Sequence, residues 1–552
     1  MFYLRIEHVV WALALAVLIV TIAYPLAMLI YCSVVTGGVP TFTAFKKMLH
    51  DRELPIYVAN TLELAVIVTI LSILIGVPLA WLVVRTDLPG KKIIRTLAVL
   101  PFVFPPYIEA IAWISIADPA IGIINRIYRA LGGHGYIVNI YTFWGLVLVM
   151  SLRFYVYVYL TTVSALEQID PSLEEAARMS GAPMLRVAKD VTIPLVMPSI
   201  VAGALLAFVA VCGNFGIPAL IGDRAHYYVL TTRIYSMLSI PDLDRAAAYS
   251  ILLLIISIPL MLLQRMVLGK RRYVTITGRA TRPSVMSLGK ARYGVFATLL
   301  AFMIPTIIIP IVTLVITAFM SSIAGNMFDI RNYTLRNFYE VLFVNNDTRT
   351  AIMDSVTLAL SAATSVALFG ALVAYIVVKT GIKGRLVLDW LSSVPFVLPG
   401  MVFAISMIFA FIRTPLYNTL TLVFIAYFAR YLSYGVRTST GALLQIDPTL
   451  EEAARVSGAN WLRVLKDVVL PLLKAGIVAG WILVFMPTLS ELTVSVILAP
   501  TLQPTIGVAI YNLMEEGQYE WTYALSSIVV VIVLVGQVLI NLITKRFGIK
   551  AM

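Results

Sequence analysis

Residues 165–203 read ALEQIDPSLEEAARMSGAPMLRVAKDVTIPLVMPSIVAG, and residues 442–480 read ALLQIDPTLEEAARVSGANWLRVLKDVVLPLLKAGIVAG. These stretches share 27 identities in 39 aligned positions without a gap, at an offset of 277 residues. A second pair, PFVFPP at 101–106 and PFVLPG at 395–400, is offset by 294 residues. Self-similarity of this kind indicates a duplicated chain. The change in offset indicates a longer loop in the first half, at 124–136.

The composition places both halves in a membrane. Of the 552 residues, 60% are hydrophobic and 12% are charged, whereas a soluble domain carries about 25% charged residues. Apolar runs of about 20 residues, the length that crosses a bilayer, recur along the chain. The predicted spans are 8–34, 58–84, 93–118, 141–166, 192–221, 246–268, 295–320, 352–378, 386–411, 416–438, 469–499 and 522–543.

The fold class predicted from these spans is an all-α integral membrane protein of about twelve transmembrane helices. An even number of spans gives both halves one orientation, so the halves form two parallel six-helix repeats. The first half is predicted at 1–268, a basic cytoplasmic linker at 269–294, and the second half at 295–552. Lys and Arg are concentrated in alternate loops, and the positive-inside rule then places both termini in the cytoplasm. The net charge of +13 is explained in this way, and nucleic-acid binding is not expected.

The repeated stretch between spans has the pattern of a capped surface helix. Asp170-Pro171 and Asp447-Pro448 are helix starts, with an acidic N-cap followed by proline at the first helical position. Gly181 breaks the helix, and a second short, basic helix is expected to follow it. Capping and positive-inside charge explain a loop of this composition, but they leave the near identity of its two copies unexplained. A cytoplasmic partner that contacts both copies in the same way explains that identity.

This stretch resembles the EAA motif of ABC importer permeases, at 172–194 and 449–471. The matching residues are Glu175, Ala176, Ala177, Gly181 and Pro194, and again Glu452, Ala453, Ala454, Gly458 and Pro471. The resemblance implies the type I importer permease fold and a coupling helix in each copy that docks on an ATP-binding cassette subunit. It also implies two such ATPase subunits, an extracytoplasmic substrate-binding protein, and residence among the lipids of the plasma membrane.

The chain has no G-x-x-x-x-G-K-[ST] phosphate loop, which predicts that ATP is hydrolysed by partner subunits. We therefore expect a transport subunit that is not an enzyme and binds no cofactor. The segments GNFGIPALIG (213–222) and FMPTLSELTVSVILAP (485–500) resemble the ferric-iron permeases of the family. Thiamine, polyamine, phosphonate or another small solute remains an alternative cargo. A secondary transporter is a remote alternative, because it needs no pair of near-identical cytoplasmic helices.

Polar residues inside the predicted spans are candidates for the transport pathway, because such groups are unfavourable in lipid. Arg153 maps onto Arg430 at the offset of 277, and Asn214 maps onto Glu491 in the same way. Glu109 lies in the third span. These side chains either line a hydrated path or brace the helix bundle, and the sequence leaves both readings open. The two cysteines and four histidines show no metal-ligand spacing, so no metal site is predicted.

Overall fold

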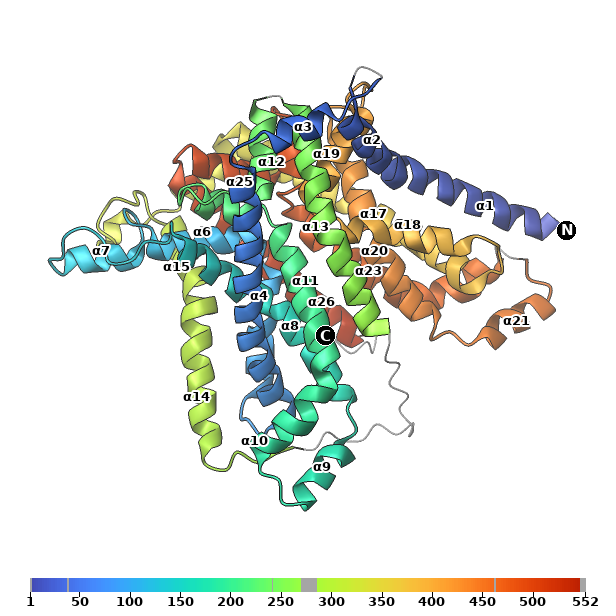
Figure 1. Ribbon diagram of the computed structural model, residues 1–552, viewed down its shortest axis with the longest axis horizontal. Helices are drawn as coiled ribbons and strands as arrows, with labels where there is room; N and C mark the ends of the chain where they lie inside the picture. Colours follow the sequence, from blue (N-terminus) through green and yellow to red (C-terminus); the bar gives the residue numbers. More distant parts are fainter. Residues whose placement is uncertain (1, 37–38, 241, 270–284, 461–462, 547–552) are drawn as a thin grey trace. The chain divides into compact units, whose positions relative to one another are not determined.

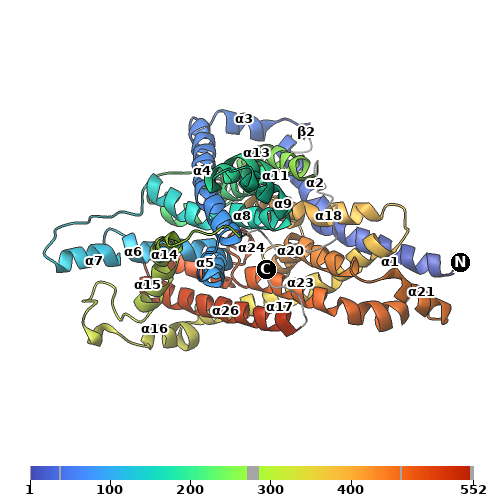
Figure 2. The same ribbon diagram turned by 90° about the horizontal axis from the view of Figure 1, so that it is seen from below.

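The structure is a computed structural model that describes residues 2–36, 39–240, 242–269, 285–460 and 463–546. Most of the predicted basic linker, at 270–284, lies outside these residues. The chain forms two compact units (Figures 1 and 2). Unit 1 comprises Met1–His50, Met237–Ile251 and Thr334–Met552, and unit 2 comprises Asp51–Ser236 and Leu252–Tyr333.

Unit 2 is built from helices, several of which contain π-helical turns. Its elements are α4 (Leu54–Arg85), α5 (Lys91–Val103), α6 (Pro106–Ala117), α7 (Ile123–Ala130), α8 (Phe143–Gln168), α9 (Pro171–Met179), α10 (Met184–Val187), η2 (Ala188–Thr192), α11 (Ile193–Cys212), η3 (Pro218–Gly222), α14 (Ala291–Met303), η4 (Ile304–Ile308), α15 (Ile309–Ala318) and η5 (Ile330–Asn332). The helices α12 (Leu230–Ser239) and α13 (Leu243–Gly269) continue from one unit into the other.

Unit 1 has the same character and adds one short hairpin. Its elements are α1 (Phe2–Leu18), η1 (Ile19–Ala23), α2 (Tyr24–Val34), the antiparallel pair β1 (Val35–Thr36) and β2 (Val39–Pro40), α3 (Thr43–Leu49), α16 (Arg336–Tyr339), η6 (Glu340–Val344), α17 (Asn346–Lys379), α18 (Arg385–Val397), α19 (Gly400–Phe411), α20 (Leu420–Leu443), α21 (Pro448–Val456), η7 (Val464–Val469), α23 (Leu470–Leu489), α24 (Ser495–Leu498), α25 (Ile506–Glu515) and α26 (Tyr519–Arg546).

The predicted all-α membrane class is confirmed. Among the described residues, nine helices are long and apolar enough to cross a membrane, and two bent helix pairs raise the number to eleven. The predicted span at 416–438 falls on α20, which is not among those nine helices. It carries Arg430 and Arg437, and two arginines lower its hydropathy.

The third span of each half is bent, which corrects the continuous spans expected at 93–118 and 386–411. The pair Lys91–Val103 and Pro106–Ala117 bends by 104°, and Arg385–Phe396 with Gly400–Phe411 bends by 112°. The breaks fall on the repeated PFVFPP and PFVLPG stretches. A proline has no N–H for the helical ladder and clashes with the preceding turn, which breaks a helix at such a position.

Each unit contains a trio of helices at its centre, and the two trios correspond through the repeat. In unit 2, α4 packs against α8 and α11, and these helices run side by side in Figure 1. In unit 1, α17 packs against α20 and α23, and α17 lies beside α23 in Figure 2. The trios give each unit a buried core of small and aliphatic side chains.

Glycines at matching positions bring the helices of each trio together. A Cβ on Gly76 of α4 would lie 2.9 Å from the carbonyl oxygen of Tyr155 on α8. A Cβ on Gly370 of α17 would lie 2.6 Å from the carbonyl carbon of Gly435 on α20. These two glycines are 294 residues apart, which is the offset of the second repeat pair, PFVFPP and PFVLPG. Small residues that let helix backbones approach are typical of packing within a membrane.

The compact units differ in composition from the halves predicted at 1–268 and 295–552. In unit 1, α2 from the first half packs against α19 from the second half. In unit 2, α15 from the second half packs against α6 from the first half. The predicted halves therefore describe the duplicated sequence. In the compact units, by contrast, the first helices of each half belong to the same unit as the later helices of the other half. Each of these two helices packs against the part of a bent pair that follows its prolines.

Candidate functional site

The predicted coupling segments fold as two matching capped helices, α9 and α21. The Asp170 carboxylate accepts a hydrogen bond from the backbone N–H of Ser172 (3.0 Å), and Asp447 accepts one from Thr449 (2.9 Å). These backbone hydrogen bonds lower the pKa of each aspartate below its usual value. Since the helix N-terminus favours the charged form, both carboxylates act as N-caps, as predicted.

The same helices end in the same way. Gly181 and Gly458 have positive φ values of 81° and 86°, which favour glycine because it has no Cβ. The N–H of the following alanine bonds back to Ala177 in the first copy (3.2 Å) and to Ala454 in the second (3.0 Å). This arrangement is a Schellman-type C-cap. The N-cap, the helix and the C-cap are thus formed by the same contacts in two segments that are 277 residues apart in the sequence.

The segment after each stop runs directly into the next span. Pro194 lies in the first turn of α11 and follows the π-helical turn η2, and Pro471 lies in the first turn of α23 and follows η7. The short basic helix expected after Gly181 is therefore the beginning of the membrane helix. A proline cannot donate a hydrogen bond to the carbonyl four residues before it. A π-helical turn, whose hydrogen bonds join residues five positions apart, avoids the need for that bond.

Both coupling helices present a surface with charged and apolar side chains. Glu175, Ala176, Glu452 and Ala453 are exposed, and Ala177 and Ala454 are partly exposed. Two apolar side chains next to them, Met179 and Val456, are 90% and 89% exposed. Exposed apolar side chains rimmed by charge are typical of a protein–protein contact.

One residue of the motif faces the opposite way and was missed by the sequence reasoning. Glu174 is fully buried, and its Oε1 accepts hydrogen bonds from Arg85 Nε (3.0 Å) and Thr192 Oγ1 (2.7 Å). In the second copy, Glu451 Oε1 lies 2.9 Å from Lys379 Nζ. Arg85 and Lys379 are the last residues of α4 and α17 and are 294 residues apart. That shared offset is the signal in the sequence that could have identified them.

Two of the candidate pathway residues of unit 2, Arg153 and Glu109, meet at the bend between α5 and α6. Arg153 Nη1 lies 3.5 Å from Glu109 Oε1, and both side chains are about one-tenth exposed. Arg153 also donates to the carbonyl oxygen of Pro101. In an intact helix that carbonyl would accept from residue 105, which is a proline without an N–H. Arg153 therefore replaces the hydrogen bond that the bend removes.

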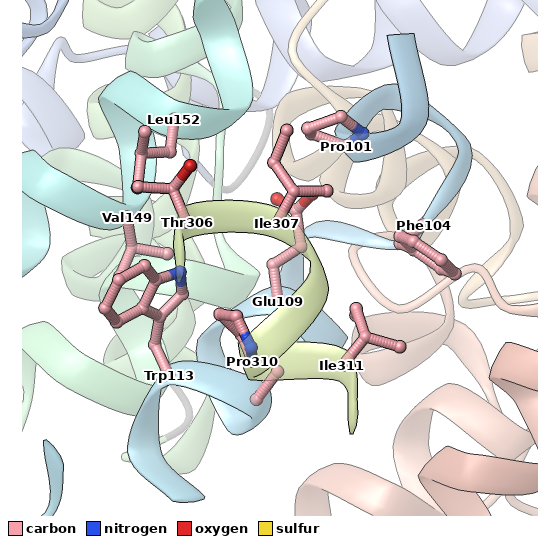
Figure 3. Close-up of a pocket in the computed structure, with 11 residues that line it drawn as sticks. Pro101, Phe104, Glu109, Trp113, Val149, Leu152, Thr306, Ile307, Pro310 and Ile311 are labelled. Carbon is pink, nitrogen blue, oxygen red and sulfur yellow. The ribbon is translucent and has the colours of Figure 1, made fainter. Parts of the chain in front are cut away.

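A small cavity lies beside this ion pair. It has a volume of about 20 Å³, enough for one water molecule. Figure 3 shows the Glu109 side chain between Pro101, Ile307 and Pro310, with Trp113 on the same wall. Its Oε2 is buried and has no hydrogen-bond partner among the described residues. The cavity walls are otherwise mainly apolar.

Arg430 of unit 1 occupies the corresponding place with a different set of neighbours. Its guanidinium lies against Gly400, where a Cβ would be 2.8 Å from Nη2. Its Cζ is 6.0 Å from the centre of the Tyr431 ring. The position equivalent to Glu109 holds Phe403, and the carboxylate that interacts electrostatically with Arg430 is that of Glu491. The two arginines match in sequence, but their partners differ between the units.

Asn214 and Glu491 share one structural task. Asn214 Oδ1 accepts from the N–H of Ile217 (3.1 Å), three residues later. Glu491 Oε2 accepts from the N–H of Val494 (2.8 Å), also three residues later, and from that of Ser495 (3.1 Å). Each side chain caps the short helical segment that follows α11 or α23. All five candidate pathway residues thus have contacts expected of residues that brace the bundle. Hydrogen bonds or ion pairs within the protein are formed by Arg153, Glu109, Asn214 and Glu491, and Arg430 packs against Gly400 and Tyr431.

Among the residues that the structure describes, no group of three or more His, Cys, Asp or Glu side chains could hold a metal ion. Cys32 and Cys212 are free thiols.

Known proteins resemble this chain over most of its length. A ferric transport system permease protein from Actinobacillus pleuropneumoniae is 26% identical, with 90% of this chain and 74% of that protein covered. An Fe(3+)-transport system permease protein from Haemophilus influenzae is 23% identical, with 92% and 93% covered. A spermidine/putrescine transport system permease protein from Haemophilus influenzae is 28% identical over 38% of this chain and 82% of that protein.

One family matches the chain twice, at residues 66–273 and 366–549, and the two matches cover more than half of its length. Each match contains one coupling helix, α9 or α21, and two of the three central helices of one unit, α8 with α11 or α20 with α23. The third central helix, α4 or α17, is covered only in its C-terminal part. The predicted duplication and the predicted family are thereby confirmed. This multi-pass membrane protein is a transport subunit that belongs to the family of binding-protein-dependent transport system inner membrane components.

Proposed function

We propose that this chain is the permease of an ATP-driven importer that takes up ferric iron from an extracytoplasmic binding protein. The observation that carries the proposal is the pair of exposed coupling helices, α9 and α21, capped and stopped by the same contacts in both units. Two surfaces of such similar sequence fit the same kind of partner. Two ATP-binding cassette subunits, one on each helix, are the occupants that the proposal names.

The ion-paired glutamates support this assignment because they orient the helices. With Glu174 and Glu451 buried, the exposed side of each helix carries Glu175 or Glu452 together with Met179 or Val456. A helix held in this way presents a defined surface, which lowers the ordering penalty when a partner binds. The side with the EAA residues is therefore proposed as the ATPase contact.

The proposal that the cargo is ferric iron rests on the names of similar proteins. Two permeases that carry ferric iron in their names cover at least 90% of this chain, whereas the polyamine relative covers 38%. The alternative cargo within the same mechanism is thiamine, polyamine, phosphonate or another small solute. Specificity is assigned to the binding protein, because the described residues contain no cluster of metal ligands.

We also propose an orientation of the chain in the membrane and separate roles for the chain and its partner subunits. Both termini and both coupling helices lie in the cytoplasm, on the side that the positive-inside rule selects. The chain binds no cofactor of its own, and ATP is used by the partner subunits. Arg153, Arg430, Asn214 and Glu491 hold the bent and broken helices in shape, and Glu109 is proposed as the residue that meets internal water.

Uptake by membrane vesicles tests this function. Vesicles containing the chain, its ATPase and its binding protein are given labelled ferric iron with and without ATP. Iron accumulation that requires both ATP and the binding protein is the expected result. Hydrolysis without iron uptake would redirect the cargo to polyamine, thiamine or phosphonate, each tested in the same vesicles. Uptake that ignores ATP but follows an ion gradient would instead identify a secondary transporter.

A further inference from the structure

The joint between each coupling helix and the membrane helices is a buried ion pair. In unit 2 the side chains of Arg85 and Glu174 are both fully buried. Arg85 is the last residue of α4, and Thr192, the second partner of Glu174, directly precedes α11. One carboxylate oxygen thus connects α9 to the ends of two membrane helices, at 3.0 and 2.7 Å.

The joint in unit 1 uses the same position with a simpler contact. Glu451 Oε1 lies 2.9 Å from Lys379 Nζ, and the two side chains are 8% and 10% exposed. Lys379 also donates to the carbonyl oxygen of Ile446, in the turn before α21 (3.1 Å). The position equivalent to Thr192 is Val469, so the second hydrogen bond of unit 2 has no counterpart here.

The joint in unit 2 is also attached to the end of the linker between the halves. The N–H of Met286 donates to the carbonyl oxygen of Arg85 (2.8 Å), and the N–H of Asp87 donates to that of Met286 (3.0 Å). The Asp87 carboxylate accepts from the N–H of Leu288 (2.7 Å) and lies 3.6 Å from Arg292 Nη1. The hydrogen bond from Leu288 is the main reason that the pKa of Asp87 is lowered.

Stability alone is a poor reason for such joints. A buried ion pair loses its hydration, and a well-packed apolar pair of similar size is often at least as stable. What the pair provides is a fixed and directional contact, because removing either charge leaves the other buried without compensation. In unit 2 the Nη1 and Nη2 groups of Arg85 have no hydrogen-bond partner among the described residues, so Glu174 is its main compensation.

We propose that Glu174 and Glu451 are positioning residues that transmit movement from the coupling helices to α4, α11 and α17. This proposal rests on the proposed function, because it assumes that ATPase subunits move α9 and α21. The residue that binds the partner and the residue that transmits its movement are then neighbours in each copy: Glu175 beside Glu174, and Glu452 beside Glu451. The joint in unit 2 is the stronger of the two, since it has an additional hydrogen bond and the linker contact.

The test uses the full chain assembled with its ATPase and binding protein in vesicles. The double variant R85Q/E174Q removes both charges of the joint together and leaves groups that can hydrogen-bond to each other. The matched control is R95Q/E167Q, which removes an exposed ion pair (2.9 Å) between α5 and α8. ATPase binding, ATP hydrolysis and substrate uptake are measured on the same preparation.

The expected result for R85Q/E174Q is unchanged ATPase binding with about tenfold more ATP hydrolysed per substrate imported, within the usual range of coupling between two sites. K379Q/E451Q should shift this ratio in the same direction by less, and the control should not shift it. A merely structural role would lower the amount of folded complex and leave the ratio unchanged.

A second variant covers the case in which the double variant does not fold. T192V keeps both charges and gives unit 2 the residue that unit 1 has at the equivalent position. It should raise the ratio of ATP to substrate by about threefold, a fraction of the loss of the whole joint. A wild-type ratio in R85Q/E174Q, or in T192V where the double variant is unfolded, would overturn the inference. Failure of the wild-type chain to bind any ATPase would instead overturn the proposed function.

Discussion

Glu174 and Glu175 are neighbours in α9 and face opposite environments: Glu174 is fully buried against Arg85, whereas Glu175 is exposed. Glu451 and Glu452 repeat the relationship in α21. A pair of adjacent glutamates therefore separates two tasks, with one carboxylate directed toward the membrane helices and the other directed toward a partner.

The close approach of α17 and α20 predicts that a methyl group at Gly370 is destabilising. A Cβ there would lie 2.6 Å from the carbonyl carbon of Gly435, a backbone atom that cannot rotate away. We expect G370A to destabilise the protein by about 1–3 kcal/mol, the range for overpacking. Thermal unfolding of the purified protein measures this effect.

G441A is the matched control for that change. Gly441 also lies within a helix of unit 1, and a Cβ there would have no neighbour within 4 Å. Alanine is the better helix former, so this variant should be neutral or slightly stabilising. Equal unfolding temperatures for the two variants would contradict the packing described for α17 and α20.

The contact of Arg153 with Glu109 and Pro101 predicts a stability effect at the first bend. R153A leaves the buried Glu109 carboxylate and the Pro101 carbonyl without their partner. Removing one member of a buried pair destabilises a protein by about 3–5 kcal/mol. We expect less folded protein from R153A, and partial recovery when the change is combined with E109L.

The same experiment separates bracing from lining. If Arg153 braces the helix bundle, uptake per folded molecule should stay near the wild-type value in the double variant R153A/E109L. Normal folding of R153A with abolished uptake would show instead that the side chain serves the transport path.

The capping role of Asp170 and Asp447 predicts a difference between asparagine and alanine. D170N retains an acceptor for the N–H of Ser172, whereas D170A removes it. Faster amide exchange in α9 is expected for D170A and a near-normal rate for D170N. The same order in α21 is expected for D447N and D447A, and equal rates for Asn and Ala would exclude capping.

The pH dependence of this cap follows from the lowered pKa of both aspartates. A group whose folded pKa is lowered contributes stability that is present above its unfolded pKa and is lost as pH falls through the folded pKa. The caps should therefore remain intact at neutral pH. Exchange in α9 and α21 should accelerate only in acid, below the ordinary pKa of about 3.9 for aspartate.

Local patterns in the sequence predicted the helices, their caps and the duplication. Asp170 and Gly181 lie within one short stretch of sequence. Their roles at the start and the end of the helix depend on hydrogen bonds between residues that are close in the chain. The bends at 101–106 and 395–400 were visible as prolines, but membrane helices also tolerate proline within a span. Whether such a helix continues or turns depends on packing partners, here α15 on α6 and α2 on α19.

The buried joints were not predicted, because the shared offset relates Arg85 to Lys379 but does not show which residues they contact. Arg85 lies 89 residues before Glu174, and only the folded chain shows which of two adjacent glutamates faces it. The exchange of first helices is unpredictable for the same reason, since the repeat indicates equivalence and not contact. Glu109 and Glu491 also lack a carboxylate at their equivalent positions, Phe403 and Asn214, so the offset gave no pairing for them.

The central claim is that α9 and α21 each bind one ATPase subunit through the exposed side of the EAA motif. The most direct test is the number of ATPase subunits bound per chain, measured by the mass of the purified complex. We expect two subunits on the wild-type chain, one on E175R or E452R, and none on the double variant. The control E516R, at an exposed site, should retain two. Two ATPase subunits still bound to the double variant would contradict the central claim.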